Sequence, residues 1–291
     1  MLPLFFAVSF AYTVTVLFTN ARFAEMTLSV AQDTFRLARR SPYTLTDRFR
    51  LTIYAASDID CSFFEPFDCV DTQISFTDYQ ALLLLRLYTL RTNLAYPHVN
   101  VTGYFMLDSD VVLLRNVADR LDRSTADVVF QREVPCALQQ CVNGGVWWVR
   151  VGSQPVLEFL NRIISLMVTL RLPDQEAFDL AVATKSHTLR LEFLPPFRYP
   201  NGFVLEANDK LLSSSIHLAH ANWCDYRHKR QRLQQIAASR SGYLPTPLST
   251  NQTRICKQIR SLDLHNLAPV FGCRSAQSCE KRISDRCLDV S

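Results

Sequence analysis

The stretch Gly103-Tyr-Phe-Met-Leu-Asp-Ser-Asp-Val-Val-Leu-Leu114 decides how this chain is expected to fold. Its first five residues form an apolar run too short for a helix, and they predict a buried strand that ends at Asp108. Asp108 and Asp110 then interrupt an otherwise apolar segment, where an unpaired charge would be costly to desolvate. Ligands of open parallel sheets bind at the carboxyl ends of the strands. The stretch therefore predicts a ligand site at this strand end, with a metal or a basic group facing the two acids.

The segments before this stretch alternate between strand and helix patterns. Residues 13–19 and 50–55 have the composition of buried strands, and residues 22–39 and 77–94 have the amphipathic pattern of helices. This alternation is typical of an α/β fold with a parallel sheet. We predict one Rossmann-like domain with a mostly parallel central sheet flanked by helices.

The chain divides into three predicted parts. Residues 1–12 are apolar but lack the basic start and the clear cleavage site of a signal peptide, so they are expected to be a signal or anchor remnant or the lead-in to the first strand. An N-terminal anchor that would associate with a membrane is therefore not clearly present. Residues 13–235 are the predicted catalytic domain, and residues 236–291 are an irregular, cysteine-rich tail.

Charge and cysteine content limit the partners and the compartment. The formal net charge is only +4, and residues 227–232 form the one basic cluster, so we expect no nucleic-acid partner. The chain has nine cysteines without a C-x2-C pair, a pattern that favours disulfides over zinc and leaves at least one thiol unpaired. Two glycosylation sequons begin at Asn100 and Asn251. We expect the lumen of the secretory pathway, such as the Golgi.

Two carboxylates one residue apart at a strand exit suit a hard divalent cation. Such a cation bridges the oxygens of a diphosphate and neutralises the charge on a departing nucleotide. A surface turn is the alternative, because an Asp-Ser-Asp triplet is also a common turn composition. A second alternative is a haloacid-dehalogenase-like phosphohydrolase, in which Asp108 would be the nucleophile.

Five segments together resemble a known family. Met106–Asn116 looks like the DxD segment of GT-A glycosyltransferases, especially the nucleotide-diphospho-sugar transferases of glycosyltransferase family 77. Four further segments match that family's motifs in order along the chain, so the resemblance covers roughly residues 13–233. They are the Asn-x-Gly strand at Val142–Arg150, the Asp-Gln helix at Asp174–Asp179, the Pro-Asn-Gly segment at Tyr199–Phe203 and the His-Ala-Asn block at His220–Trp223.

The resemblance implies a metal site. Asp110 and His220 are its expected direct ligands, and Asp108 is a ligand or a partner of the nucleotide ribose. An imidazole among the ligands favours Mn²⁺ over Mg²⁺. Taken alone, His220 would more often be a hydrogen-bonded core histidine, and His217 is a competing candidate.

The resemblance also implies the donor-binding residues. Asp174 and Gln175 are expected beneath the donor sugar as catalytic residues, although Asp174 also fits the start of a helix. Lys229 resembles a phosphate-binding lysine, but the glycine that the family places between His220 and that lysine is missing. The other expected contacts to the nucleotide sugar are Thr19, Asn20, Arg86, Asp108, Ser109, Asn143, Gly144 and Asn222.

Arg86 and the tryptophan pair have alternative structural interpretations. Arg86 sits in an amphipathic helix pattern, where an arginine is usually solvated or lies along the surface. Trp147 and Trp148 alternate along the predicted strand, so we expect one of them in the core.

The implied activity is transfer of a hexose or pentose from a nucleotide-diphosphate donor, a UDP-sugar above all, to a hydroxyl of a glycan or glycoprotein. The reaction would depend on metal and retain the anomeric configuration, by analogy with the family. The phosphohydrolase and a catalytically silent sugar-binding protein of the same fold stay as alternatives.

Overall fold

The computed structural model describes residues 12–40, 49–75, 79–134, 141–207, 215–222 and 226–238. Residues 1–11 and residues 239–291 of the predicted tail lie outside this range, as does the second sequon. Within the described part of the chain, no helix is both long and apolar enough to cross a membrane.

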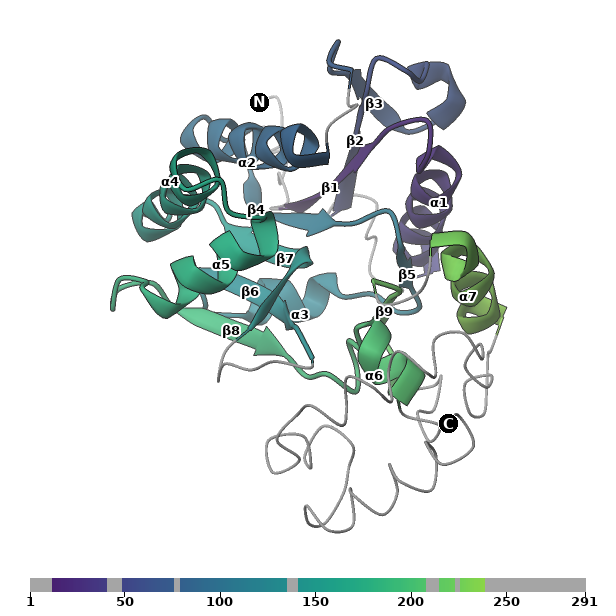
Figure 1. Cartoon of the computed structure of the whole chain (residues 1–291). Coiled ribbons are helices and arrows are strands. Elements are labelled where there is room, and N and C mark those ends of the chain that lie inside the picture. The colour runs from purple at the N-terminus through teal and green to yellow at the C-terminus, as the bar shows by residue number, and fades with distance from the viewer. Residues whose placement is uncertain are drawn as a thin grey trace, which may run out of the picture.

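A central sheet of seven strands carries the fold (Figure 1). Six strands run in one direction, and β7 runs antiparallel to both of its neighbours. The prediction of a mostly parallel sheet is therefore confirmed. In spatial order the strands are β3 (Asp68–Asp71), β2 (Phe49–Ala55), β1 (Tyr12–Thr19), β4 (Val101–Leu107), β7 (Val142–Arg150), β6 (Val128–Arg132) and β8 (Leu191–Leu194).

Helices cover both faces of this sheet (Figure 1). The predicted strands and helices before Asp108 form within two residues of their expected bounds. A small second sheet pairs β5 (Val111–Leu113) with β9 (Leu218–His220). The helices are α1 (Ala24–Arg40), the 3-10 helix η2 (Cys61–Phe64), α2 (Tyr79–Ala95), α3 (Ala118–Arg123), α4 (Gln154–Thr169), α5 (Asp174–Ala183), α6 (Gly202–Ala207) and α7 (Tyr226–Ala238).

The two faces of the sheet bury separate apolar clusters. Helices α2, α4 and α5 pack on one face with Trp147, and α1, α3 and β5 pack on the other with Trp148. We expected one tryptophan in the core, but both are core residues, since each is only 1% exposed. Their strand β7 lies between β4 and β6 with helices on both faces, so successive side chains are buried on opposite sides.

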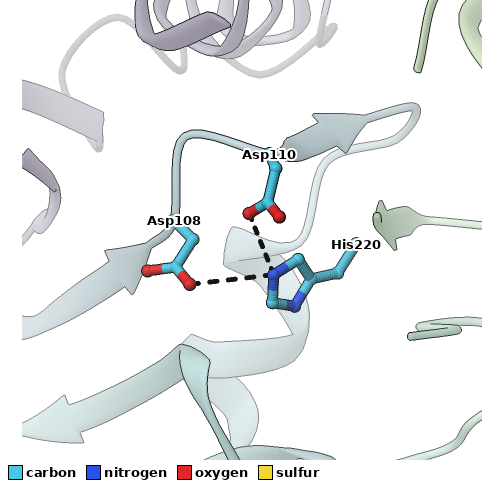
Figure 2. A group of neighbouring side chains, drawn as sticks. All are labelled: Asp108, Asp110 and His220. Carbon is cyan, nitrogen blue, oxygen red and sulfur yellow. Dashed lines mark hydrogen bonds and ion pairs between the residues drawn. The ribbon is translucent and has the colours of Figure 1, made fainter. Parts of the chain in front are cut away.

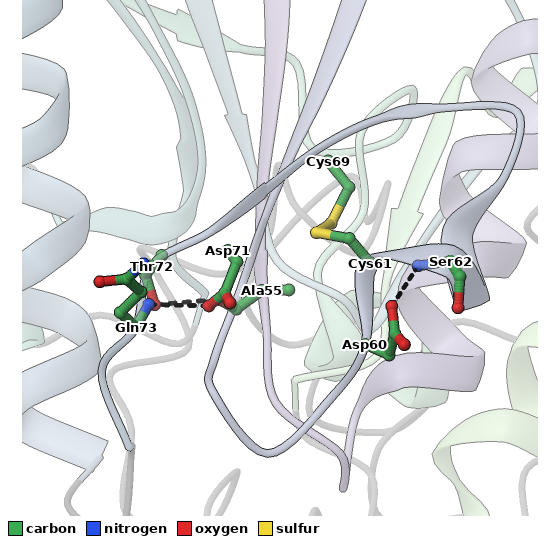
Figure 3. Close-up of a disulfide and its surroundings, with 8 residues drawn as sticks. All are labelled: Ala55, Asp60, Cys61, Ser62, Cys69, Asp71, Thr72 and Gln73. Carbon is green, nitrogen blue, oxygen red and sulfur yellow. Dashed lines mark hydrogen bonds between the residues drawn. A yellow bond between two sulfur atoms is a disulfide. The ribbon is translucent and has the colours of Figure 1, made fainter.

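A disulfide joins Cys61 in η2 to Cys69 in β3, with a Cα–Cα distance of 5.5 Å (Figure 3). Asp60 begins the short helix, because its side chain accepts a hydrogen bond from the backbone N–H of Ser62. Cys141 is disulfide-bonded as well. The preference for disulfides over zinc is confirmed for these three cysteines, and the pairing of the tail cysteines stays a prediction.

Candidate active site

Three potential metal ligands meet where β4 ends (Figure 2). Asp108 follows β4 directly, and Asp110 immediately precedes β5. The β5–β9 pairing sets Val111 opposite His220, which brings the histidine to the two acids from more than 100 residues along the chain. One ligand atom from each side chain lies within 4.8 Å of the others. Asp110 and His220 are buried, and Asp108 is partly exposed.

A hydrogen bond behind His220 fixes the direction of its ring. Gln131 donates its amide N–H to the Tyr199 carbonyl at 3.0 Å, so its oxygen faces His220 Nδ1, also at 3.0 Å. Nδ1 therefore carries a proton, and Nε2 faces the carboxylates of Asp110 at 3.0 Å and Asp108 at 3.7 Å. A hydrogen bond to the second ring nitrogen is the usual way in which metal-binding histidines are oriented. In the sequence Gln131 is only a polar residue directly after the apolar run Val128–Phe130, and the structure shows that it is buried.

A basic side chain lies against each of the two carboxylates and balances its negative charge. Arg86 donates to Asp108 Oδ1 at 2.6 Å and to the Gly144 carbonyl at 3.1 Å, and Lys229 Nζ lies 2.5 Å from Asp110 Oδ2. Burial alone would raise the pKa of Asp110, but His220 and Lys229 together hold it well below its ordinary value. Arg86 is only 8% exposed, so the alternative of a solvated surface arginine is wrong.

Gly145 makes the approach of the ligands possible. A Cβ built on it would lie 2.6 Å from His220 Cε1 and 2.7 Å from Asp108 Cγ, and would overlap a carboxylate oxygen of Asp108. The Gly145 carbonyl also accepts the Asp108 backbone N–H at 2.7 Å. The family motif directed attention to Gly144 instead, where a Cβ would meet the Phe178 ring at 3.3 Å. Only the fold shows which of the two glycines lies against Asp108 and His220.

Asp174 and Gln175 lie beside this site at the start of α5. Burial raises the pKa of the Asp174 carboxyl, with Arg86 opposing the shift and Asp108 adding to it. The residue before the helix is Pro173, so Asp174 is its first residue rather than its cap. Gln175 is held by the backbone of β7, because its oxygen accepts from Gly144 N at 3.3 Å and its nitrogen donates to the Val142 carbonyl.

A small cavity of about 80 Å³ opens onto the acids, and its polar lining consists of Arg86, Asp108, Ser109, Asp110 and Lys229. Phe18 and Phe23 contribute two of its apolar walls. A larger cavity of about 460 Å³ lies between α1 and α7 and contains none of the predicted site residues. The chemistry therefore points to the smaller cavity.

Thr19 and Asn20 lie between Phe18 and Phe23 in the sequence but are not among the residues that line the cavity. The Thr19 hydroxyl donates to the Asn20 carbonyl at 3.2 Å, and the Asn20 side chain accepts from Phe23 N at 3.3 Å in the turn that starts α1. His217 is turned toward Tyr199, whose hydroxyl lies 3.3 Å from His217 Nδ1. This competing histidine is therefore not among the three grouped ligands.

The side chains of Asn143 and Asn222 are both engaged within the protein. Asn143 Oδ1 accepts from Gly145 N at 2.9 Å, and Asn222 Oδ1 accepts from the backbone N–H of Gly202 at 2.8 Å. Both amide nitrogens donate to Glu133, a residue that the sequence pattern did not single out.

Comparison with known proteins agrees with this geometry. Residues 66–233 match the family model described as nucleotide-diphospho-sugar transferase. No curated protein sequence matches the chain significantly. Three similar solved structures are glycosyltransferases, and at their low sequence identities the likeness concerns the fold.

The first is a glycosyltransferase involved in glycosylation of the major capsid of PBCV-1, with 13% identity, a TM-score of 0.50, and coverage of 77% of this chain and 99% of that one. The galactosyltransferase LgtC has 10% identity and a TM-score of 0.51, with 81% and 97% covered. GlyE of Streptococcus pneumoniae TIGR4 has 11% identity and a TM-score of 0.54, with 78% and 60% covered.

The family model spans more than half of the chain and includes the Asp108–Asp110 strand end. The narrower resemblance to glycosyltransferase family 77 stays a prediction. On the family match, the sheet and the acid–histidine site together, this chain belongs to the nucleotide-diphospho-sugar transferases and has the GT-A glycosyltransferase fold.

Proposed function

We propose that this protein transfers a hexose or pentose from a UDP-sugar to a hydroxyl of a glycan or glycoprotein, depends on a divalent metal, and retains the anomeric configuration. The grouping of Asp108, Asp110 and His220 within 4.8 Å carries the proposal. It lies at the strand end where ligands of such sheets bind. Retention is proposed by analogy with the family, since both configurations are compatible with this site.

The donor set fits a divalent cation held by Asp110, His220 and Asp108. Two carboxylate oxygens and one imidazole nitrogen suit Mn²⁺ better than Mg²⁺, which prefers oxygen ligands alone. When bound, such a cation neutralises negative charge on the diphosphate leaving group. Lys229 supplies a second positive charge next to Asp110, and its proposed role is to bind a phosphate oxygen.

The sugar end of the donor is proposed to lie toward Gly144 and Asp174. Gly144 lies beside the Asp174 carboxyl, because a Cβ built on the glycine would be 3.7 Å from Asp174 Oδ2. Arg86 links the two ends, because it contacts both Asp108 and the Gly144 carbonyl. Gln175 would support the sugar from below by holding the β7 backbone in place.

The remaining predicted contacts complete the proposed donor site. Thr19, Asn20 and Ser109 would meet the nucleotide, and Asn143 and Asn222 would border the sugar. Disulfides at Cys61–Cys69 and at Cys141 support an oxidising compartment, which we propose is the Golgi or another part of the secretory lumen.

Donor hydrolysis tests the proposed function directly. Purified protein is incubated with a panel of UDP- and GDP-sugars and Mn²⁺, with and without a chelator, and the released nucleoside diphosphate is measured. Chelator-sensitive release from one donor is the expected result, and it would also identify the sugar. Silence across the panel with cleavage of a phosphomonoester would favour the phosphohydrolase alternative. Donor binding without release, even when candidate acceptors are added, would favour a silent sugar-binding protein.

A further inference from the structure

Glu133 lies at the centre of a hydrogen-bond cluster next to the acid–histidine site. It follows β6, and its carboxylate accepts hydrogen bonds from the side-chain nitrogens of Asn143 and Asn222. Oε2 accepts from both asparagines, and Oε1 lies 3.4 Å from the Asn222 nitrogen. One carboxylate therefore joins β6, the start of β7 and the segment after β9.

The Asn143 branch leads to Asp108. With its nitrogen on Glu133, Asn143 turns its oxygen to the Gly145 N–H at 2.9 Å. The Gly145 carbonyl in turn accepts the Asp108 N–H at 2.7 Å. Gly145 is also the residue whose missing side chain lets Asp108 and His220 approach each other. Three consecutive hydrogen bonds thus connect Glu133 to the backbone of one proposed metal ligand.

The Asn222 branch leads to the other two ligands. Asn222 is two residues beyond His220, and its oxygen accepts the Gly202 N–H of α6 at 2.8 Å. Between them, Ala221 donates its N–H to the Asp110 carbonyl at 2.9 Å. The segment that carries His220 is therefore bound to Glu133 on one side and to the Asp110 backbone on the other.

The chemistry of a carboxylate determines how both asparagines are oriented. The two ends of an asparagine amide have nearly the same shape, so the hydrogen-bond partners decide which end is oxygen. An ionised carboxylate only accepts, so it selects both nitrogens and leaves both oxygens for the N–H groups of Gly145 and Gly202. A flipped amide at either position would set its nitrogen against a backbone N–H.

We infer that Glu133 is a positioning residue that holds the segments of Asp108 and His220 in register for metal and donor binding. The inference rests on the proposed function, because it concerns the same site. Glu133 is not one of the grouped ligand residues, and it acts through Asn143 and Asn222.

Two substitutions separate positioning from a role of the charge itself. Glu133→Ala removes the acceptor for both amides, whereas Glu133→Gln can place its oxygen where Oε2 lies and keep both bonds. Titration with Mn²⁺ alone, followed by paramagnetic resonance, is expected to show affinity weakened by about 10- to 100-fold in Glu133→Ala, the usual effect of losing such an outer partner. Glu133→Gln should stay within about threefold of wild type. Equal loss in both variants would overturn the positioning role.

A distant glutamate provides the matched control. Glu192 on β8 accepts a hydrogen bond from Ser124 at 2.6 Å and pairs with Arg120, away from the acid–histidine site. Glu192→Ala is expected to lower the melting temperature without changing Mn²⁺ affinity. Normal Mn²⁺ binding by Glu133→Ala would overturn the positioning role of Glu133 and leave the proposed metal site intact. No Mn²⁺ binding by the wild-type protein would overturn the proposed metal site, and the inference with it.

A repair experiment covers the case in which Glu133→Ala does not fold. Asn143→Asp sets a second carboxylate against Glu133 and should weaken Mn²⁺ binding by on the order of tenfold. Adding Glu133→Gln supplies an amide donor to the new acid and leaves its oxygen in the place of Oε1, 3.4 Å from the Asn222 nitrogen, so it should recover part of that loss. A double variant no better than Asn143→Asp would contradict the proposed orientation.

Discussion

Replacing Gly145 by alanine adds one methyl group at the most crowded point of the site. Its Cβ would lie 2.6 Å from His220 Cε1 and 2.7 Å from Asp108 Cγ, where ordinary contact needs 3.4–4 Å. Both side chains, or the strand that carries residue 145, must therefore move by roughly 1 Å, and misplacement of that size costs on the order of 10²-fold in rate. This corresponds to about 2.7 kcal/mol of transition-state stabilisation.

The expected result for Gly145→Ala is a folded protein with weak Mn²⁺ binding and about 10²-fold slower release of nucleoside diphosphate. Mn²⁺ titration and donor hydrolysis would be measured on the same preparation, with thermal denaturation as the check on folding. Wild-type Mn²⁺ affinity and turnover in a folded variant would refute the placement of Asp108 and His220 around one ion.

Gly103→Ala is the matched control for crowding. A Cβ there would lie 2.5 Å from the Val149 carbonyl oxygen and would also overlap the Trp148 ring, so steric conflict is comparable but lies away from the ligands. We expect a lower melting temperature and an unchanged Mn²⁺ affinity in the folded fraction. Gly152→Ala is a second control, for backbone strain without crowding, because Gly152 has a φ of 78° and nothing lies within 4 Å of the added carbon.

Three further predictions concern other parts of the site and the fold. Asp110→Ala should abolish chelator-sensitive turnover, by about 10³-fold or more, in a protein that still unfolds cooperatively; full activity would rule out the metal assignment. Gln175→Ala should lower turnover and, because two hydrogen bonds to β7 are lost, reduce the free energy of unfolding by about 1–2 kcal/mol. Complete unfolding of this variant would assign Gln175 to structure alone. Hydrogen bonds from Arg190 lower the pKa of the Asp127 carboxyl and outweigh the opposing effect of burial. The ionised carboxylate therefore stabilises the folded state fully above the unfolded pKa of about 3.9. This contribution is lost as pH falls through the lower pKa of the folded state. Asp127→Asn should therefore lose about 1 kcal/mol at pH 7, with the difference from wild type shrinking below about pH 4 in urea titrations; a gap that does not depend on pH would contradict this assignment.

The local pattern predicted the first half of the fold well because each segment there has a clear period. Residues 13–19 and 50–55 have strand composition and form β1 and β2, while the helix patterns form α1 and α2. The antiparallel insertion of β7 between β4 and β6 was not predictable in this way. Strand order depends on contacts between distant segments, and the residues of one strand do not encode its neighbours.

Some residues of the site were predicted from the sequence, and others were found only in the structure. Asp108, Asp110 and His220 were identified by motif, and the fold brings all three together. Gln131, Glu133 and Gly145 were missed, because an amide, an acid or a second glycine carries no distinctive spacing. Their importance comes from partners such as the His220 ring and the Asn222 amide, which arrive from other strands.

The sequence by itself determined the α/β class, the acids at a strand end and the preference for disulfides, since these follow from local period, residue chemistry and composition. Tertiary structure alone decided that β9 delivers His220 to those acids, that Arg86 is buried against Asp108, and that both tryptophans are core residues. The physical reason is that charge pairing, burial and close approach are properties of distant segments in contact. The sequence pattern indicates which chemistry a side chain can perform. Which residue it contacts depends on how the strands pair in the folded sheet.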